Sequence, residues 1–331
     1  MVDAMGVGVF VSWSRLSRRT RDLAEALNLK LIHIPYGPPY IRAWVETGRL
    51  LAEARPGLVA AQLPQGPLLL RLALLRRRLR YRLVADVHSG FVVYESLAER
   101  LLNQPFRGLL RGCDLVLSHN EPFTGLLVER LRVPRERVLT VYDPVPPRMP
   151  GRRPSIEGLE PRGYLLMPAA WAADEPMDQL AEAWRLSRLH REGYLLVVTG
   201  DHRRRPRLAE RLRSLPGVVL TGYLPVEEYR WLLENAAAVL ALTTKEYTVL
   251  SALWEAVAYE KPAVVSRTET LESLVGRGYP CLSPTEPRAL AEAMRRCLEH
   301  GGDAVKAYPR LRRLSRESIE ELKARLKELL P

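Results

Sequence analysis

Short apolar runs alternate with helical stretches along most of this chain, and this alternation limits the fold more than any other feature. A strand, a crossover helix and a second strand form a parallel βαβ unit. The sequence therefore predicts an α/β fold with parallel sheets. The runs that indicate strands lie at 7–11, 29–34, 58–62, 83–87, 115–117, 138–140, 164–167, 194–199, 218–221, 239–242 and 263–265.

A proline-rich segment divides the alternation into two series. Residues 143–161 contain six prolines and little periodicity, as is typical of a linker. A chain of 331 residues also favours two domains over one. We therefore expect a Rossmann-like domain over 1–145, a linker over 146–161, a second such domain over 162–302 and an amphipathic terminal helix within 303–331.

The segment 243–266 joins an apolar strand to a polar loop, a helix and a second strand. Residues 249–259 have helical spacing, and Lys261-Pro262 ends the predicted helix. In a parallel α/β sheet such a loop lies at the carboxyl edge, where ligands bind. The first backbone amides of the helix also favour a pyrophosphate group.

This segment resembles the signature region of the GT-B glycosyltransferases, especially glycosyltransferase family 4. Glu255-Ala256 on the helix and Pro262-Ala-Val-Val at the strand entry carry the resemblance. It implies two Rossmann-like domains that face a central cleft, with the terminal helix returning to the first domain. It also implies transfer of a sugar from a UDP- or GDP-sugar to a lipid-linked or glycan acceptor. Eight residues separate Glu246 from Glu255, one more than is usual in the family.

The resemblance assigns a donor site to the second domain. Glu255 is expected to bind the ribose, because one carboxylate accepts hydrogen bonds from two neighbouring hydroxyls. Lys245 and Thr248 are expected at the donor phosphates, and Glu246 is assigned to the transferred sugar as a catalytic residue. The other predicted donor-binding residues are Trp171, Gly200, Arg203, Tyr223, Tyr247 and Val249.

Many members of the family neutralise the donor phosphates with an Arg and a Lys from the loop after the first strand of the second domain. This chain has Ala170-Trp-Ala-Ala-Asp-Glu175 there, so the pair is absent. The replacement cations are Lys245 or the pair Arg203 and Arg204, unless those arginines form a solvated turn. The Trp-x-x-Asp-Glu arrangement is similar to that of the mannosyltransferase that adds the first mannose in the dolichol pathway.

Residues at predicted strand ends of the first domain supply candidates for the acceptor side. His88 is predicted to be catalytic, taking a proton from the acceptor or hydrogen-bonding the transferred sugar, since imidazole titrates near neutrality. The alternative is a structural histidine. Ser12, Arg15 and Asp86 are assigned to the acceptor side. No cluster has metal-ligand spacing, so neither a metal nor another cofactor is expected.

The net charge of +12 is compatible with anionic partners or with an arginine-rich, ion-paired surface of the thermophilic kind. Residues 68–83, LLLRLALLRRRLRYRL, suit either a helix lying on an anionic membrane or a crossover helix with a basic face. A recognised nucleic-acid module is absent, so no nucleic-acid partner is expected. No apolar run approaches the ~20 residues that span a bilayer, and no signal-peptide pattern is found. The sequence therefore predicts a cytoplasmic protein, peripheral on the inner face of the cell membrane.

Two other functions stay open at this point. The absent Arg–Lys pair favours a noncatalytic GT-B protein that binds a partner. A sugar-nucleotide epimerase is the second alternative, and it requires more acidic and histidine residues near the cleft than the sequence places there.

Overall fold

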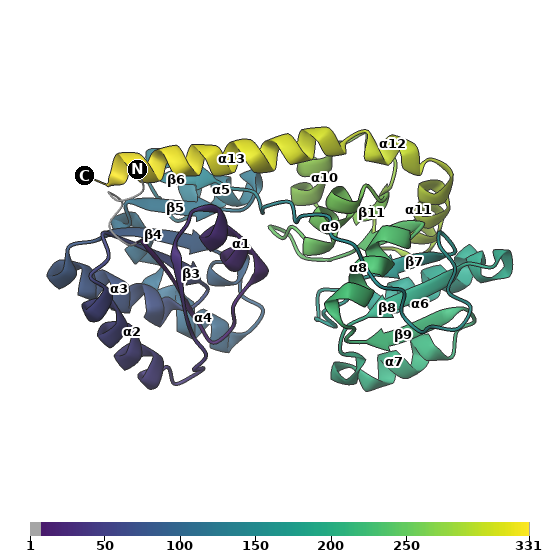
Figure 1. The fold of residues 1–331 in the computed structure, drawn as a ribbon, viewed down its shortest axis with the longest axis horizontal. Helices are drawn as coiled ribbons and strands as arrows, with labels where there is room; N and C mark the ends of the chain where they lie inside the picture. The colour runs from purple at the N-terminus through teal and green to yellow at the C-terminus, as the bar shows by residue number, and fades with distance from the viewer. Residues whose placement is uncertain (1–7, 331) are drawn as a thin grey trace. The chain divides into compact units, whose positions relative to one another are not determined.

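The computed structural model describes residues 8–330, and the chain divides into two compact units (Figure 1). The first unit contains the residues up to Pro144 together with those from Leu314 onward, and the second contains Val145–Arg313. Val7, where the first strand was predicted to begin, lies outside the described residues.

The first unit is built on a six-stranded parallel sheet in the order β2-β1-β3-β4-β5-β6. Crossover helices cover both faces of such a sheet, so its central strands are apolar on both sides. Every residue of β1 and β3 is buried accordingly. The strands are β1 Val9–Trp13, β2 Lys30–Ile34, β3 Leu58–Leu63, β4 Arg82–Val87, β5 Leu115–Ser118 and β6 Val138–Thr140.

Five α-helices and three 3-10 turns connect these strands within the described part of the first unit. They are α1 Arg18–Ala26, α2 Ile41–Ala54, α3 Gly66–Leu79, η1 Ser89–Phe91, α4 Leu97–Asn103, η2 Gln104–Gly112, α5 Glu121–Glu129 and η3 Arg135–Arg137.

The leucine- and arginine-rich segment 68–83 is not a single helix, which corrects its predicted extent. Helix α3 ends at Leu79 because Arg80 has a left-handed backbone conformation, and β4 begins at Arg82. Three leucines of α3 face the core, and Arg76 forms a 2.8 Å ion pair with Asp114. Leu74 remains exposed on α3. The buried face belongs to a crossover helix, and the exposed face is basic.

The second unit contains another six-stranded parallel sheet, in the order β12-β11-β10-β7-β8-β9. Its chain runs outward from β7 through β8 to β9, then returns to the other side of β7 with β10. The sheet therefore has its topological switch point between β7 and β10, where α/β proteins bind ligands. The strands are β7 Tyr164–Met167, β8 Leu195–Thr199, β9 Val218–Gly222, β10 Ala238–Ala241, β11 Ala263–Ser266 and β12 Leu282–Ser283.

Two predicted helix limits in the second unit were wrong. Helix α6 ends at Ser187 rather than near Arg191, because Arg188 has a positive φ of 56°. Helix α9 begins at Ser251 rather than Val249, because Leu250 is extended. The helices and 3-10 turns are α6 Met177–Ser187, η4 Leu189–Glu192, η5 His202–Arg204, α7 Pro206–Arg213, α8 Val226–Asn235, α9 Ser251–Tyr259, α10 Glu269–Val275, α11 Pro287–Glu299 and α12 Gly301–Val305.

The proline-rich segment after Pro144 packs on the second unit. The backbone N–H of Arg152 donates a 2.9 Å hydrogen bond to the carbonyl of Glu227 in α8. A Cβ on Gly151 would lie 2.2 Å from the backbone nitrogen of Trp231, so only glycine allows this close approach. This part of the chain is therefore fixed by backbone contacts.

The long helix α13, Tyr308–Leu329, begins in the second unit and ends in the first (Figure 1). Leu322 and Leu326 pack into the first unit's core beside Phe10, Leu115 and Leu139. Burying such leucines contributes roughly 1.5–3 kcal/mol each. No described helix is both long enough and apolar enough to cross a membrane.

Candidate functional site

A cavity of about 550 Å³ lies at the carboxyl edge of the second unit's sheet. Met167 at the end of β7, Thr199 at the end of β8 and Gly222 at the end of β9 contribute to its wall. Leu240 of β10 also lines it, so the cavity lies at the topological switch point. This is the position at which α/β sheets bind ligands.

Glu255 places a carboxylate in this cavity from the middle of helix α9. The residue is only 9% exposed, and its Oε2 accepts a hydrogen bond from the hydroxyl of Tyr229, which also lines the cavity. A carboxylate has several lone-pair sites and accepts more than one hydrogen bond. The geometry is therefore suited to a ligand that presents hydroxyl groups.

The N-terminus of α9 forms another part of the wall, through Ser251 and Ala252. The helix begins after Leu250, which provides no side-chain cap, and its first turn contains no acidic residue. The first amides of a helix carry a partial positive charge and favour anions. The carboxylate of Glu255 and this helix start therefore offer two different chemistries to one ligand.

Glu175 is a second buried carboxylate in the cavity, and sequence reasoning assigned it no role. It is 7% exposed, and its two oxygens accept hydrogen bonds from the backbone N–H groups of Ala170 (2.7 Å) and Ala172 (3.1 Å). Burial raises the pKa of Glu175 despite these hydrogen bonds. The available signal was the Asp-Glu pair after Trp171, but the sequence did not indicate that the side chain turns back onto its own loop.

Gly200 lines the cavity where two loops touch, whereas Trp171 supports it from behind. Gly200 has a φ of +85°, and a Cβ there would lie 1.9 Å from the carbonyl oxygen of Ala169. The buried indole of Trp171 donates a 2.9 Å hydrogen bond to the carbonyl of Thr199. Only glycine therefore fits at position 200, and the predicted contact of Trp171 with a ligand stays a prediction.

The residues predicted in the loop after β10 lie together, but beside α10. The carboxylate of Glu246 accepts hydrogen bonds from the backbone N–H groups of Glu269 (2.8 Å) and Thr270 (3.3 Å) at the start of that helix. The backbone N–H of Tyr247, which has a φ of +58°, donates to the Thr270 hydroxyl. Among the described residues that line the cavity, none comes from positions 245–249, a range that includes Lys245, Thr248 and Val249.

The predicted donor-binding residues near β8 and β9 differ in position. Tyr223 lines the cavity and is largely exposed. The side chain of Arg203 is 81% exposed and forms a 2.7 Å ion pair with Asp201. Arg204 instead donates a 3.2 Å hydrogen bond from its Nη1 to the carbonyl of Ala170, a residue of the cavity wall.

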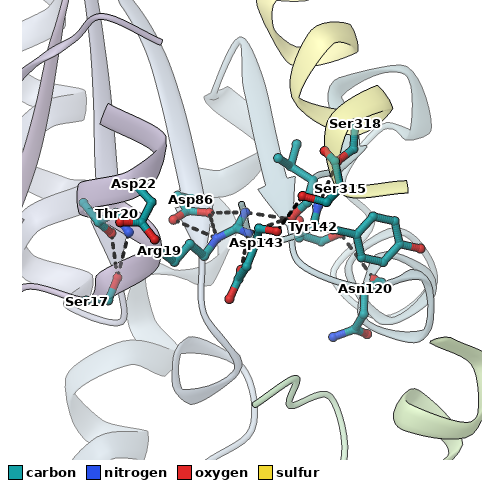
Figure 2. Close-up of polar contacts among 12 residues, drawn as sticks. Ser17, Arg19, Thr20, Asp22, Asp86, Asn120, Tyr142, Asp143, Ser315 and Ser318 are labelled. Atoms are coloured by element: carbon teal, nitrogen blue, oxygen red, sulfur yellow. Dashed lines mark hydrogen bonds and ion pairs between the residues drawn. The ribbon is translucent and has the colours of Figure 1, made fainter. Parts of the chain in front are cut away.

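The first unit gathers charged residues around Arg19 at the carboxyl edge of its own sheet (Figure 2). Arg19 forms ion pairs with Asp86 (2.9 Å) and with Asp143 (2.7 Å), and it also donates to the carbonyl of Val141. His88 Nε2 lies 3.3 Å from Asp86 Oδ2. Burial alone raises the pKa of Asp86, but Arg19 and His88 outweigh it and hold that pKa well below its usual range.

The other acceptor-side candidates lie near the end of β1. Ser12 is buried, and its hydroxyl is 2.9 Å from His33 Nδ1. Arg15 is exposed in the following loop, where its carbonyl accepts a hydrogen bond from the side chain of Gln62. Within residues 8–330, no three histidine, cysteine or acidic side chains are grouped so that they could hold a metal ion.

Two family models match the chain, one on each unit. The glycosyltransferase family 4 model matches residues 6–148, and the glycosyl transferases group 1 model matches residues 163–300. The chain belongs to the GT-B glycosyltransferases of the family 4 type. No curated protein matches it in sequence.

Solved structures share the fold of this glycosyltransferase at low identity. The Anabaena Alr3699/HepE complex with UDP-glucose matches with a TM-score of 0.72 at 14% identity, covering 97% of this chain and 100% of that chain. Sucrose-phosphate synthase from Thermosynechococcus elongatus has a TM-score of 0.70 at 15% identity, covering 97% and 98%. A UDP-forming trehalose-phosphate synthase from Burkholderia xenovorans has a TM-score of 0.73 at 11% identity, covering 98% and 99%. These likenesses agree with the predicted GT-B fold.

Proposed function

We propose that this glycosyltransferase moves a sugar from a UDP- or GDP-sugar to a lipid-linked or glycan acceptor at the cytoplasmic face of a membrane. The observation that supports the donor class is the cavity in which the Glu255 carboxylate and the N-terminus of α9 lie together. A nucleoside diphosphate presents a cis-diol and an anionic group, which these two features are suited to bind.

In this proposal the nucleoside occupies the cavity and Glu255 accepts hydrogen bonds from its ribose. The amides of Ser251 and Ala252 lie at the diphosphate, and Tyr223 and Gly200 line the remaining wall. Lys245 and Thr248 are assigned to the phosphates and Glu246 to the transferred sugar, as expected from the sequence. The protein stabilises the charge on the leaving diphosphate and positions the acceptor.

The proposed reaction breaks the bond between the sugar's anomeric carbon and the diphosphate oxygen, which keeps the electron pair. A hydroxyl oxygen of the acceptor forms the new bond to the same carbon and loses its proton. His88, held by Asp86, is the proposed partner for that proton or for the sugar's hydroxyls. Ser12 and Arg15 are assigned to the acceptor, and Asp86 acts through His88.

Calorimetric titration of the full chain with UDP, GDP, uridine and guanosine tests the donor class. We expect one nucleoside diphosphate to bind more tightly than its nucleoside, and the matching nucleotide sugar to be slowly hydrolysed in the absence of acceptor. Failure of every nucleotide to bind would remove the proposal.

A noncatalytic GT-B binding protein is the second candidate. The observation that favours it is the cavity wall, in which no described residue is an arginine, lysine or histidine. Binding of a nucleotide sugar without hydrolysis or transfer over long incubation would support this candidate. Conversion of the nucleotide sugar to an epimer, followed by NMR, would instead support an epimerase.

A further inference from the structure

The donor cavity has a charge that does not match the ligand proposed for it. Its ionisable carboxylates are Glu175 and Glu255, and no arginine, lysine or histidine is present among the described lining residues. A diphosphate is anionic, and hydrogen bonds from neutral backbone amides neutralise it only in part. A cation from just outside the cavity is therefore required near the phosphates.

Arg204 is the cation held against the cavity wall. Its Nη1 donates a 3.2 Å hydrogen bond to the carbonyl of Ala170, and the N–H of Ala170 is itself bound to the Glu175 carboxylate. One residue of the wall therefore contacts both a buried anion and a guanidinium group. An arginine has five N–H donors, so this single hydrogen bond leaves others for phosphate oxygens.

The backbone around Arg204 is fixed by several contacts. Trp171 donates to the carbonyl of Thr199, and its ring makes an edge contact with His202 at a centroid distance of 6.1 Å. Gly200 donates to the carbonyl of Gly222, and the N–H of Arg204 lies 3.2 Å from the carbonyl of Asp201. The 3-10 turn η5 is therefore attached to the loops on either side of the cavity, which preorganises its arginines.

The neighbouring cations are already engaged or lie elsewhere. Arg203 pairs with Asp201 at 2.7 Å, and Arg205 lies 3.8 Å from Asp178. Lys245 is in the loop beside α10 and does not line the cavity. Within residues 8–330, Arg204 forms no ion pair, so its charge is available to a ligand.

We propose that Arg204 binds the diphosphate of the nucleotide-sugar donor and supplies the positive charge that the cavity wall lacks. This proposal rests on the proposed donor site and adds a residue from η5 to it. It replaces the function of the absent Arg–Lys pair by a guanidinium from the next strand-end loop. Arg203, which the sequence favoured equally, faces Asp201 instead.

The test compares Arg204→Gln with the matched control Arg203→Gln in calorimetric titrations of the full chain. UDP and GDP are titrated beside uridine and guanosine. We expect Arg204→Gln to weaken the preferred nucleoside diphosphate by about tenfold or more, because a hydrogen bond to a charged group is lost. The matching nucleoside should change by less than about threefold, and Arg203→Gln should leave both nearly unchanged.

Three further outcomes decide the proposal. Arg204→Lys keeps the charge and should recover part of the diphosphate affinity. Equal losses for diphosphate and nucleoside, or equal losses in the two Gln variants, would overturn the role of Arg204 while leaving the donor site intact. If the unaltered protein binds neither UDP nor GDP, both the donor site and this proposal are wrong.

Discussion

Each unit of the protein buries carboxylates at the carboxyl edge of a parallel sheet, but the two units neutralise them differently. Asp86 in the first unit pairs with the buried guanidinium of Arg19. Glu175 and Glu255 in the second unit are held by backbone amides and by the hydroxyl of Tyr229, all of which are neutral. The same place in the fold therefore has opposite electrostatics in the two units.

The difference has a physical consequence for ligands. A carboxylate paired with an arginine inside the protein is a closed system, and removing either partner leaves an uncompensated buried charge. A carboxylate held by neutral donors keeps its negative charge and retains lone pairs for a hydroxyl ligand. The first unit's network therefore contributes to structure, whereas the second unit's cavity is suited to binding.

The largest effect is expected from Arg19→Met in the first unit. Removing the guanidinium leaves Asp86 buried and unpaired, and breaking such a pair costs about 3–5 kcal/mol. Denaturant unfolding measures the loss. Arg18→Met is the control, because the Arg18–Asp22 pair is partly exposed and is worth about 0–1 kcal/mol. Similar losses in the two variants would contradict the closed network.

Adding Asp86→Asn to Arg19→Met sharpens this prediction. The second substitution removes the unpaired charge, so part of the lost stability should return. A double variant that is less stable than Arg19→Met would indicate that Asp86 is stabilised by groups other than Arg19.

A smaller effect is expected for Glu255→Gln in the second unit. The side chain keeps its shape but loses charge-assisted hydrogen bonds to the ribose, which are worth about 1.5–3 kcal/mol. Calorimetry should therefore find nucleotide affinity lowered by roughly 10- to 150-fold. Glu260→Gln is the control, since Glu260 follows the same helix and pairs with Arg312 on the surface. Unchanged affinity in a folded Glu255→Gln protein would remove the ribose assignment.

The two kinds of carboxylate should also respond oppositely to pH. Burial raises the pKa of Glu175, so its contribution to stability falls as pH rises above the ordinary glutamate range, about 4.3. Glu175→Gln should remove this decrease from the unfolding free energy measured between pH 4 and 8. The Asp86 pKa is lowered, so its stabilisation is present above about pH 3.9 and is lost only as pH falls towards its folded-state value. A variant with the same pH slope as the unaltered protein would contradict the assignment to Glu175.

The smallest effect concerns the basic face of α3, which we expect to contact anionic membranes. Arg77 and Arg78 are exposed, whereas Arg76 is paired with Asp114, so Arg77→Glu/Arg78→Glu changes the surface without breaking that pair. Each basic residue near an anionic surface contributes about 1 kcal/mol. Flotation with phosphatidylserine vesicles at low salt should fall in the variant. If the variant and the unaltered protein float equally, or neither floats, α3 is only a crossover helix.

Local patterns predicted the strands and the GT-B fold because an apolar run of four or five residues is sufficient to define a buried strand. The predicted limits of β7, Tyr164–Met167, agree with the structure. The starts and ends of helices were less accurate, since Leu250 and Arg188 adopt backbone conformations that their residue types do not specify.

The candidate site was harder to predict because side-chain direction depends on distant contacts. Glu246 turns to the start of α10, where Thr270 lies 24 positions away in the sequence. Glu175 binds amides of its own loop, and no spacing pattern indicates such a contact. Arg203 and Arg204 are adjacent and identical in type, so only the structure distinguishes the one that faces the cavity wall.

The fastening of α13 to the first unit has a consequence for the order of folding during synthesis. Ser315 donates to the carbonyl of Asp143, and Ser318 accepts from the N–H of Tyr142, while Leu322 and Leu326 complete the core (Figure 2). These residues leave the ribosome after the whole of Val145–Arg313. The second unit therefore has its full sequence before the first, and the part of the chain made earliest must wait for the last helix to close its core.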